Sequence, residues 1–410
     1  MGAKMLLLLA LPTMLFAAQA FSPATDEIIL LGRAKNKMAE ALRGMPNYTC
    51  LQTIERSRRL PKRRKFELID VLRLEVGLVE GKELFAWPGS GKFEDKELSD
   101  IVPPGGAIGN GAFVAHASSV FQGRSASITF EGWDENPPRA RYSYRVPQNL
   151  SGYLIRNPTK RQAIVGYHGR FWVTPGDERV VRIEVEADDV PLFLEVLATG
   201  SSIDYNSVKI GEIDYWLPSA STMKITNIDS AEYRNDTTFS GCRQFAGESS
   251  LRFDDPTPEE AVPTPVIPET VKLPKGQYFG IQLTEALRWG KTVTGEKVQA
   301  TLADSIKQKG VVLFPKGSVV EGRVVALQVF GAGQLLELQF ESITNGARTA
   351  KFHAECFLPA RQMSMRASRS SANDRETACV PERPGIVSIA TIRGKTDLAK
   401  GFRLNWTTLQ

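Results

Sequence analysis

The sequence predicts a mainly β protein of the α+β class, built from two parts that follow one another along the chain. Short segments in which apolar and polar residues alternate recur over most of the 410 residues, and Gly, Pro, Asn and Asp turn signals separate them. No long helical segments alternate with these strands, which argues against a doubly wound parallel sheet. A proline-rich segment divides a longer first part from a second part that we expect to be a smaller β-barrel.

The N-terminus predicts export. Lys4 precedes an apolar run, and Ala18-Gln19-Ala20 has the small-x-small pattern of a signal peptidase site. We therefore expect residues 1–20 to be a cleaved signal peptide and the mature chain to lie in the periplasm or outside the cell. An uncleaved anchor is the alternative, but the apolar run is short for one. No later segment reaches the ~18 consecutive apolar residues of a membrane span.

The first part begins with a predicted helix and continues with strands. Ser22 or Thr25 can cap the helix, and Gly44 followed by Pro46 ends it. The segments "YTCLQTIERSRR", "KFELIDVLRLEVGLV" and "KELFAW" then have the composition of strands. A Gly-rich stretch and a short predicted helix over residues 112–121 interrupt the series, and strands resume from "SASITFEGW" to "TTFSGCRQFA".

The segment "DDPTPEEAVPTPVIPETVKLP" predicts the boundary between the two parts. Its prolines cannot donate regularly to a strand ladder and favour an extended spacer. We expect one domain over residues 21–254, a linker over residues 255–270 and a second domain over residues 271–410.

Four cysteines remain in the mature chain, and export permits disulfides. Four cysteines allow three pairings. Because two lie in each part, we predict Cys50 with Cys242 and Cys356 with Cys379; four buried free thiols are the alternative.

The order of elements in the first part resembles a known superfamily. A signal peptide, one helix ending before "MPNYTC", a long antiparallel meander, "YHGRFWVTPGDERVVRIEVEAD" and "VKIGEIDYWLPSASTMKI" are similar to LolA-type lipoprotein carriers and RseB/MucB-type periplasmic sensors. The resemblance implies that residues 21–253 form a curled antiparallel half-barrel with lid helices, whose hollow takes a lipid or lipoprotein acyl chain. It carries no individual functional residue with it.

Four aromatic side chains are candidates to line such a hollow. Phe85 and Trp87 share one strand face, and Tyr142 and Tyr144 share another. Aromatic residues at period two are also typical of a filled core, so both interpretations stay open. The Gly-rich "GGAIGNG" follows no strand and opens no βαβ unit, and we expect it to be a loop over the hollow.

A basic cluster lies between two predicted strands, in "RSRRLPKRRK". A solvated hairpin tip explains it without a partner. The functional alternative is contact with anionic lipid head groups or an acidic partner. The residues that would make this contact are Arg58, Arg59, Lys62, Arg63, Arg64 and Lys65.

The sequence gives little support to catalysis, metal binding or nucleic-acid binding. Of its three histidines, His116 lies beside Ser118 and Ser119, but no G-x-S-x-G, HExxH or Walker motif occurs. No cysteine and histidine cluster has zinc spacing, and the net charge of +5 is small for this length. We expect no enzyme, no cofactor and no metal.

The second part contains three similar turns, "LPKGQYFGIQL", "FPKGSVVEGRV" and "LAKGFRLNW". They share no acid, base or ligand group, so we interpret Lys-Gly as the turn that leads into a new strand, with Gly free to adopt positive φ. This part also resembles the C-terminal β-barrel of TrbI-type scaffold proteins of type IV secretion. The matching residues are Val298, Ala300, Leu302, Pro315, Lys316, Gly317, Ser318 and Gly322.

Two functions follow from these observations. The first is an exported cell-envelope protein that binds a lipid or lipoprotein acyl chain. The second is a non-enzymatic scaffold that contacts other envelope proteins, and an exported hydrolase is a distant third. The ligand and the oligomeric state have no signal in the sequence.

Overall fold

The computed structural model describes residues 26–79, 82–90, 93, 98–110, 114–123, 125–244, 268–330, 333–356, 375–379, 383–391 and 397–409. The predicted signal peptide and most of the predicted linker lie outside these residues. Among the helices described, none is long and apolar enough to cross a membrane.

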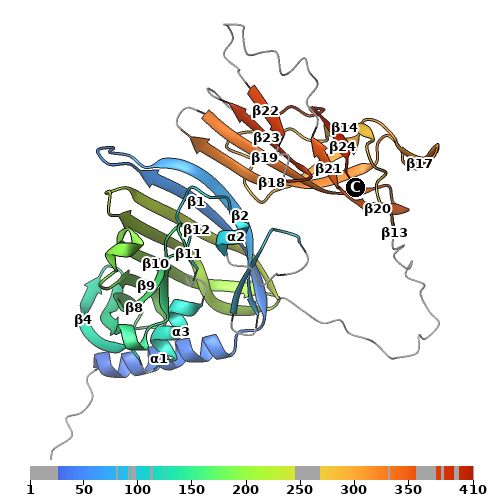
Figure 1. The fold of residues 1–410 in the computed structure, drawn as a ribbon. Helices are drawn as coiled ribbons and strands as arrows, with labels where there is room; N and C mark the ends of the chain where they lie inside the picture. Colours follow the sequence, from blue (N-terminus) through green and yellow to red (C-terminus); the bar gives the residue numbers. More distant parts are fainter. Residues whose placement is uncertain are drawn as a thin grey trace, which may run out of the picture.

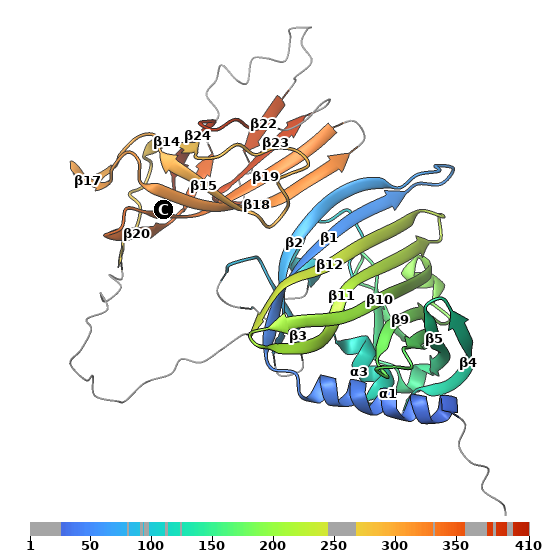
Figure 2. The same cartoon turned by 180° about the vertical axis from the view of Figure 1, so that it is seen from behind.

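The first part forms one antiparallel sheet of ten strands in the order β3-β2-β1-β12-β11-β10-β9-β8-β5-β4. The sheet curls into a half-barrel (Figures 1 and 2), as the sequence predicted. Its strands are β1 (Tyr48–Arg59), β2 (Glu67–Val79), β3 (Lys82–Ala86), β4 (Ser127–Glu135), β5 (Pro138–Val146), β8 (Tyr167–Val173), β9 (Val180–Ala187), β10 (Val196–Ile210), β11 (Ile213–Asn227) and β12 (Glu232–Gln244).

Helices lie on the inner face of this sheet. They are α1 (Asp26–Arg43), α2 (Leu98–Ile101) and α3 (Ala115–Phe121). Helix α1 begins with Asp26 and Glu27 and ends with Arg43, charges that suit the two ends of its dipole. Its buried residues, Leu30, Ala34 and Met38, recur every four positions and face the sheet. A small hairpin of β6 (Tyr153–Arg156) and β7 (Gln162–Val165) and two short 3₁₀ turns, η1 (Gln148–Leu150) and η2 (Leu192–Leu194), complete this part.

A disulfide joins Cys50 in β1 to Cys242 in β12, 192 residues apart, which confirms the first predicted pair. The strands that carry them are neighbours in the sheet. Cys356 is also disulfide-bonded, but its predicted partner Cys379 stays a prediction, because the side chain of Cys379 lies outside the described residues.

The second part forms another sheet, whose main path runs β13-β20-β19-β18-β15-β14-β24-β21, with β23 on β19 and β22 on β23. Its first strand begins at Glu269, inside the predicted linker range. The strands are β13 (Glu269–Thr270), β14 (Tyr278–Leu283), β15 (Lys297–Leu302), β18 (Val319–Phe330), β19 (Gly333–Thr344), β20 (Arg348–Lys351), β21 (Ala354–Cys356), β22 (Arg375–Cys379), β23 (Ile386–Thr391) and β24 (Arg403–Thr408); β16 (Ile306–Gln308) and β17 (Val311–Phe314) form a separate hairpin.

The three Lys-Gly turns behave as the sequence predicted. Gly276, Gly317 and Gly401 have φ values of 74°, 89° and 81°, in the region that residues with a Cβ avoid. Each turn leads within two residues into a strand, respectively β14, β18 and β24. The repeated motif therefore marks strand entry.

The two sheets contact each other along the edge of β2. The backbone of Thr294 exchanges hydrogen bonds with Val71 and Arg73, with N···O distances of 3.0 and 2.8 Å. The buried Arg323 of β18 donates to the carbonyl oxygens of Pro88 and Gly295. These contacts hold β18 beside β2.

Candidate ligand-binding site

The inner face of the first sheet carries two packed clusters, one aromatic and one mostly aliphatic. The aromatic cluster lies under α1 and α3, on β5, β8, β9 and β10. The aliphatic cluster lies on β1 and β2, under α2 and the loop that follows it. Leu42 near the end of α1 contacts both clusters, so the C-terminal half of α1 lies at the boundary between them.

Tyr142 and Tyr144 belong to the aromatic cluster and are almost fully buried. The Tyr142 ring stacks on Phe171 with centroids 5.1 Å apart, and its hydroxyl donates to the carbonyl oxygen of Glu27 in α1. Burial and the nearby charge of Glu27 raise the pKa of Tyr142 to about 12. The Tyr144 hydroxyl donates to the carbonyl oxygen of Glu184 over 2.7 Å. The two tyrosines therefore connect β5 to α1 and to β9, and their rings are part of a filled core.

His116 and its neighbouring serines do not form a nucleophile and base pair. His116 is buried, with Tyr153 at 5.6 Å and Tyr167 at 6.5 Å between ring centroids. Burial lowers its pKa to about 4, so the ring is neutral at pH 7. The Ser119 hydroxyl instead hydrogen-bonds to the hydroxyl of Tyr167, and Ser118 donates to the Gln122 side chain.

Phe85 and Trp87 both pack on the aliphatic cluster but differ in surroundings. Phe85 is buried within the cluster, whereas Trp87 is half-buried. The guanidinium of Arg323 lies 6.0 Å from the centre of the Trp87 ring. The structure therefore brings Trp87 to the contact between the two sheets, apart from Tyr142 and Tyr144.

The Gly-rich loop crosses the inner face beside the aliphatic cluster, as the sequence predicted for residues 105–110. Arg56 on β1 and Asp70 on β2 form a buried bidentate ion pair, with N···O distances of 2.7 and 2.6 Å. Arg56 also donates to the carbonyl oxygen of Pro103, and Asn235 of β12 donates to that of Ala107. Gln328 of β18 donates to Pro104, so the second sheet also holds this loop.

Gly106 allows this close approach. A Cβ atom there would lie 3.1 Å from Nε of Arg56. The buried ion pair and the loop backbone therefore pack directly against each other.

A groove opens where the two clusters meet. It has a volume of about 330 Å³ and lies between the C-terminal half of α1 and strands β9 and β11. That volume is at the lower end of the ~300 to 1,000 Å³ typical of ligand pockets. The residues that line it are Lys37, Met38, Glu40, Ala41, Gly44, Met45, Arg179, Val180, Asp214, Tyr215 and Trp216.

The groove has an apolar floor and a charged rim. Trp216 forms one wall; its indole N–H donates to the carbonyl oxygen of Val180, and the Arg179 guanidinium lies 4.8 Å above the ring. Met38 of α1 and Met45, two residues after the end of the helix, also line the groove. Flexible thioether side chains adapt to irregular apolar ligands. An apolar chain with a polar end group matches this arrangement.

Surface contacts hold α1 over the groove. Arg33 and Lys37 both pair with Glu178 in the β8–β9 turn, at 2.9 and 3.1 Å, and Lys37 also donates to the carbonyl oxygen of Asp177. These two hydrogen-bonded cations lower the pKa of Glu178. The cations are largely exposed, so these pairs add little stability.

The sequence missed the groove residues. The sequence predicts only a strand for the segment that contains Tyr215 and Trp216, and only a helix for the segment that contains Met38. An adjacent Tyr-Trp pair at the start of a strand is the signal that could have drawn attention to them. None of Phe85, Trp87, Tyr142 and Tyr144 lines this groove; their role in binding stays a prediction.

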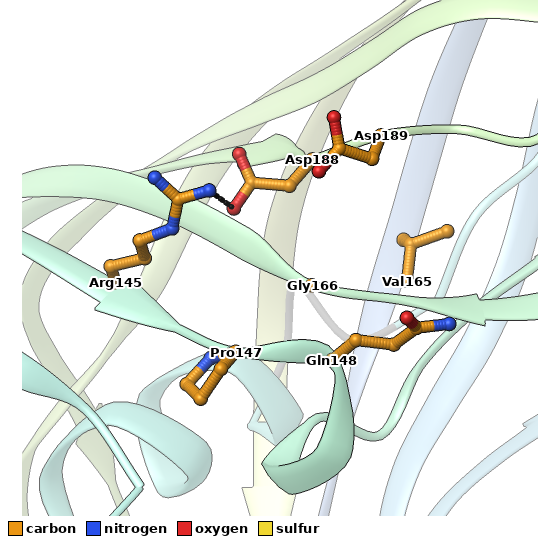
Figure 3. A pocket seen from close by; sticks show the side chains of 7 residues that line it. All are labelled: Arg145, Pro147, Gln148, Val165, Gly166, Asp188 and Asp189. Atoms are coloured by element: carbon orange, nitrogen blue, oxygen red, sulfur yellow. Dashed lines mark ion pairs between the residues drawn. The ribbon is translucent and has the colours of Figure 1, made fainter.

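A second, smaller cavity of about 160 Å³ lies near the β5, β7 and β9 strand ends (Figure 3). Asp188 is its central group: it pairs with Arg145 at 3.1 Å and bonds to Nδ1 of His168 at 2.7 Å. Asp188 is thus a structural ion-pair partner. The polar lining suits an ordered ion network better than an acyl chain.

Within the described residues, no group of three or more His, Cys, Asp or Glu side chains is arranged to hold a metal ion. The basic residues predicted to contact an anionic surface lie on the β1–β2 hairpin. Arg59 pairs with Glu232 and covers the Phe66 ring, whereas Lys62, Arg63, Arg64 and Lys65 are exposed.

Comparison with known proteins gives limited information. No family model matches the chain, and no curated protein matches it. Among solved structures, a LolA superfamily protein from Nitrosomonas europaea is similar, with 11% sequence identity, a TM-score of 0.28, and coverage of 54% of this chain and 95% of that one. A TM-score this low carries no argument, so the half-barrel description rests on the strand order of the chain itself. No finding corresponds to the predicted resemblance of the second part to TrbI-type barrels.

Proposed function

We propose that this chain is an extracytoplasmic binding protein that holds an apolar, acyl-type ligand in the groove under α1. The observation that carries the proposal is the groove itself, an apolar cavity of about 330 Å³ with methionines on the helix side and Trp216 on the sheet side. The charged rim, with Lys37 and Arg179, can meet an anionic end group such as a carboxylate. The Cys50–Cys242 disulfide agrees with an oxidising compartment.

The position of the groove also supports binding. It lies at the boundary between two packed clusters, where α1 is held at the surface by Arg33 and Lys37. A small displacement of α1 would widen the groove without disturbing the strand ladder. The helix is thereby suited to act as the lid of the half-barrel.

Titration of the delipidated mature protein with a fluorescent fatty acid tests the proposal. We expect saturable binding, and we expect Ala41→Trp, which fills the groove from α1, to weaken it at least tenfold. Asn36→Trp places the same side chain on an exposed position of α1 outside the groove and serves as the matched control. Melting temperatures of both variants report whether the fold is kept.

Two results would contradict the proposal. Wild-type protein that never binds the probe would remove the carrier function and favour the scaffold alternative. Equal weakening by both tryptophan variants would show that the probe binds somewhere other than the groove.

A further inference from the structure

One end of the half-barrel carries exposed basic and apolar side chains together. The β1–β2 hairpin ends there, and Arg59 next to its turn pairs with Glu232 at the start of β12. The adjacent β11–β12 turn contacts η2, because the Ile228 N–H donates to the carbonyl oxygen of Glu195. The hairpin tip and the β11–β12 turn therefore lie side by side (Figures 1 and 2).

The charged part of this end is the basic tip, which we define as Lys62, Arg63, Arg64 and Lys65. All four side chains are exposed, and within the described residues none forms an ion pair. The acidic residues nearby are mostly engaged: Glu232 pairs with Arg59, and Glu195 pairs with Arg161. The end therefore presents uncompensated positive charge.

The apolar part is the apolar rim, which we define as Leu60, Leu192, Phe193 and Ile228. Their exposed fractions are 40%, 74%, 48% and 53%. Each lies in or beside a turn at this end: the hairpin turn, η2 or the β11–β12 turn. Exposed apolar side chains that gather at one end of a molecule are typical of an interaction site.

We propose that this end of the half-barrel docks on an anionic lipid surface. Three separate turns each project one or two exposed apolar side chains beside the basic tip. This combination suits an anionic lipid interface, because apolar side chains insert between its head groups while basic side chains meet its charge. About 1 kcal/mol per Lys or Arg near an anionic surface makes four basic residues sufficient for measurable attraction.

Docking at this end would place the carrier against the membrane that supplies or receives an acyl ligand. The docking surface shares no residue with the groove under α1. Vesicle binding by delipidated protein can therefore fail or succeed independently of fatty-acid binding.

Co-sedimentation of the mature protein with vesicles tests the proposal. We expect binding to phosphatidylcholine vesicles that contain phosphatidylglycerol, and loss of binding to phosphatidylcholine alone. The triple variant Arg63→Gln, Arg64→Gln, Lys65→Gln should bind roughly two orders of magnitude more weakly, because each neutralised charge near the surface accounts for about fivefold. Leu192→Ser with Phe193→Ser should weaken the binding that remains at high salt.

The β16–β17 hairpin of the second sheet supplies matched controls. Lys307→Gln, Lys309→Gln, Lys316→Gln neutralises three exposed lysines, and Val311→Ser with Val312→Ser replaces residues exposed by 63% and 41%. We expect these variants to bind vesicles like the wild type.

Three results would overturn the proposal: no binding to the anionic vesicles, equal loss in the control variants, or equal competition by soluble poly-glutamate together with no effect of the Leu192 and Phe193 change. The last result would identify a site for acidic protein segments instead of a lipid surface.

Discussion

The inner faces of the two sheets are covered by different kinds of segment. The second sheet surrounds one continuous apolar cluster drawn from its own strands and turns, with Trp406 and Phe340 among the fully buried side chains. The inner face of the first sheet is covered by segments that are not strands of the sheet, namely α1, α3 and the loop after α2. A sheet whose core comes from its own strands has no separate covering segment that a ligand could displace. A sheet covered by helices and a loop can admit a ligand if one of those segments moves. This difference is the reason for placing ligand binding in the first sheet.

Both sheets contain buried polar atoms that have no hydrogen-bond partner within the described residues, including the indole nitrogen of Trp406 in the second core. On the inner face of the first sheet, the hydroxyl of Tyr205 and the side-chain oxygens of Gln52 and Asn235 are buried and have no hydrogen-bond partner within the described residues. Burial raises the pKa of Tyr205, which keeps its hydroxyl neutral. Such groups reduce the stability of a packed core. Unpaired buried polar groups therefore do not distinguish the two cores.

The largest expected effect comes from a matched pair of tryptophan truncations. Trp406→Ala removes a fully buried ring that packs edge-to-face on Phe352 at 4.9 Å, and should lower the free energy of unfolding by about 3 to 5 kcal/mol. Trp216→Ala in the groove should cost only about 1 to 2 kcal/mol. Urea unfolding followed by circular dichroism measures both. Equal losses would mean that the groove is as tightly packed as the second core.

The second prediction concerns the buried ion pair of Arg56 and Asp70 in the first sheet, compared with an exposed pair in the second. Asp70→Asn leaves the Arg56 guanidinium buried without its carboxylate and should destabilise the protein by about 3 to 5 kcal/mol. Replacing both residues, with Arg56→Met and Asp70→Leu, should restore most of that loss.

Glu269→Gln at the exposed Arg348 pair of the second sheet is the control, with an expected cost of about 0 to 1 kcal/mol. Chemical denaturation of the four proteins gives the values. A mild Asp70→Asn would show that water reaches this position and that the loop does not seal it.

The smallest expected effect is the loss of stability at acidic pH. His116 has a folded-state pKa of about 4 against 6.5 when unperturbed, so between these values the unfolded chain binds the extra proton. The contribution of the neutral His116 to the free energy of unfolding should be fully present above pH 6.5. It should decrease as the pH falls toward 4, by roughly 3 kcal/mol in total.

His116→Phe should flatten this part of the pH dependence of the free energy of unfolding. The phenylalanine ring can pack against Tyr153 and Tyr167 but has no proton to gain. Unfolding curves across the pH range test the expectation. An unchanged slope in the variant would show that His116 does not cause the acid sensitivity between pH 4 and 6.5; the lowered pKa of Glu178 acts in a more acidic range.

Much of the local structure follows from the sequence. The helix over Asp26–Arg43, the strand Tyr48–Arg59 and the positive φ of Gly276, Gly317 and Gly401 all agree with the predictions. These features depend on capping, periodicity and the absence of a Cβ, which are properties of neighbouring residues. The Cys50–Cys242 pair was also predictable, because export and the division of the chain reduced the possible pairings.

Tertiary structure alone decided the roles of individual side chains. Arg56 belongs to the same basic run as Arg63 and Arg64, but strand register places it opposite Asp70 and under the loop carbonyl of Pro103, so it is buried while they are exposed. The groove joins α1 to Trp216, more than a hundred residues away in sequence. Local patterns record which face of a strand is apolar, but what covers that face depends on contacts between distant segments, and those contacts form only when the sheet curls.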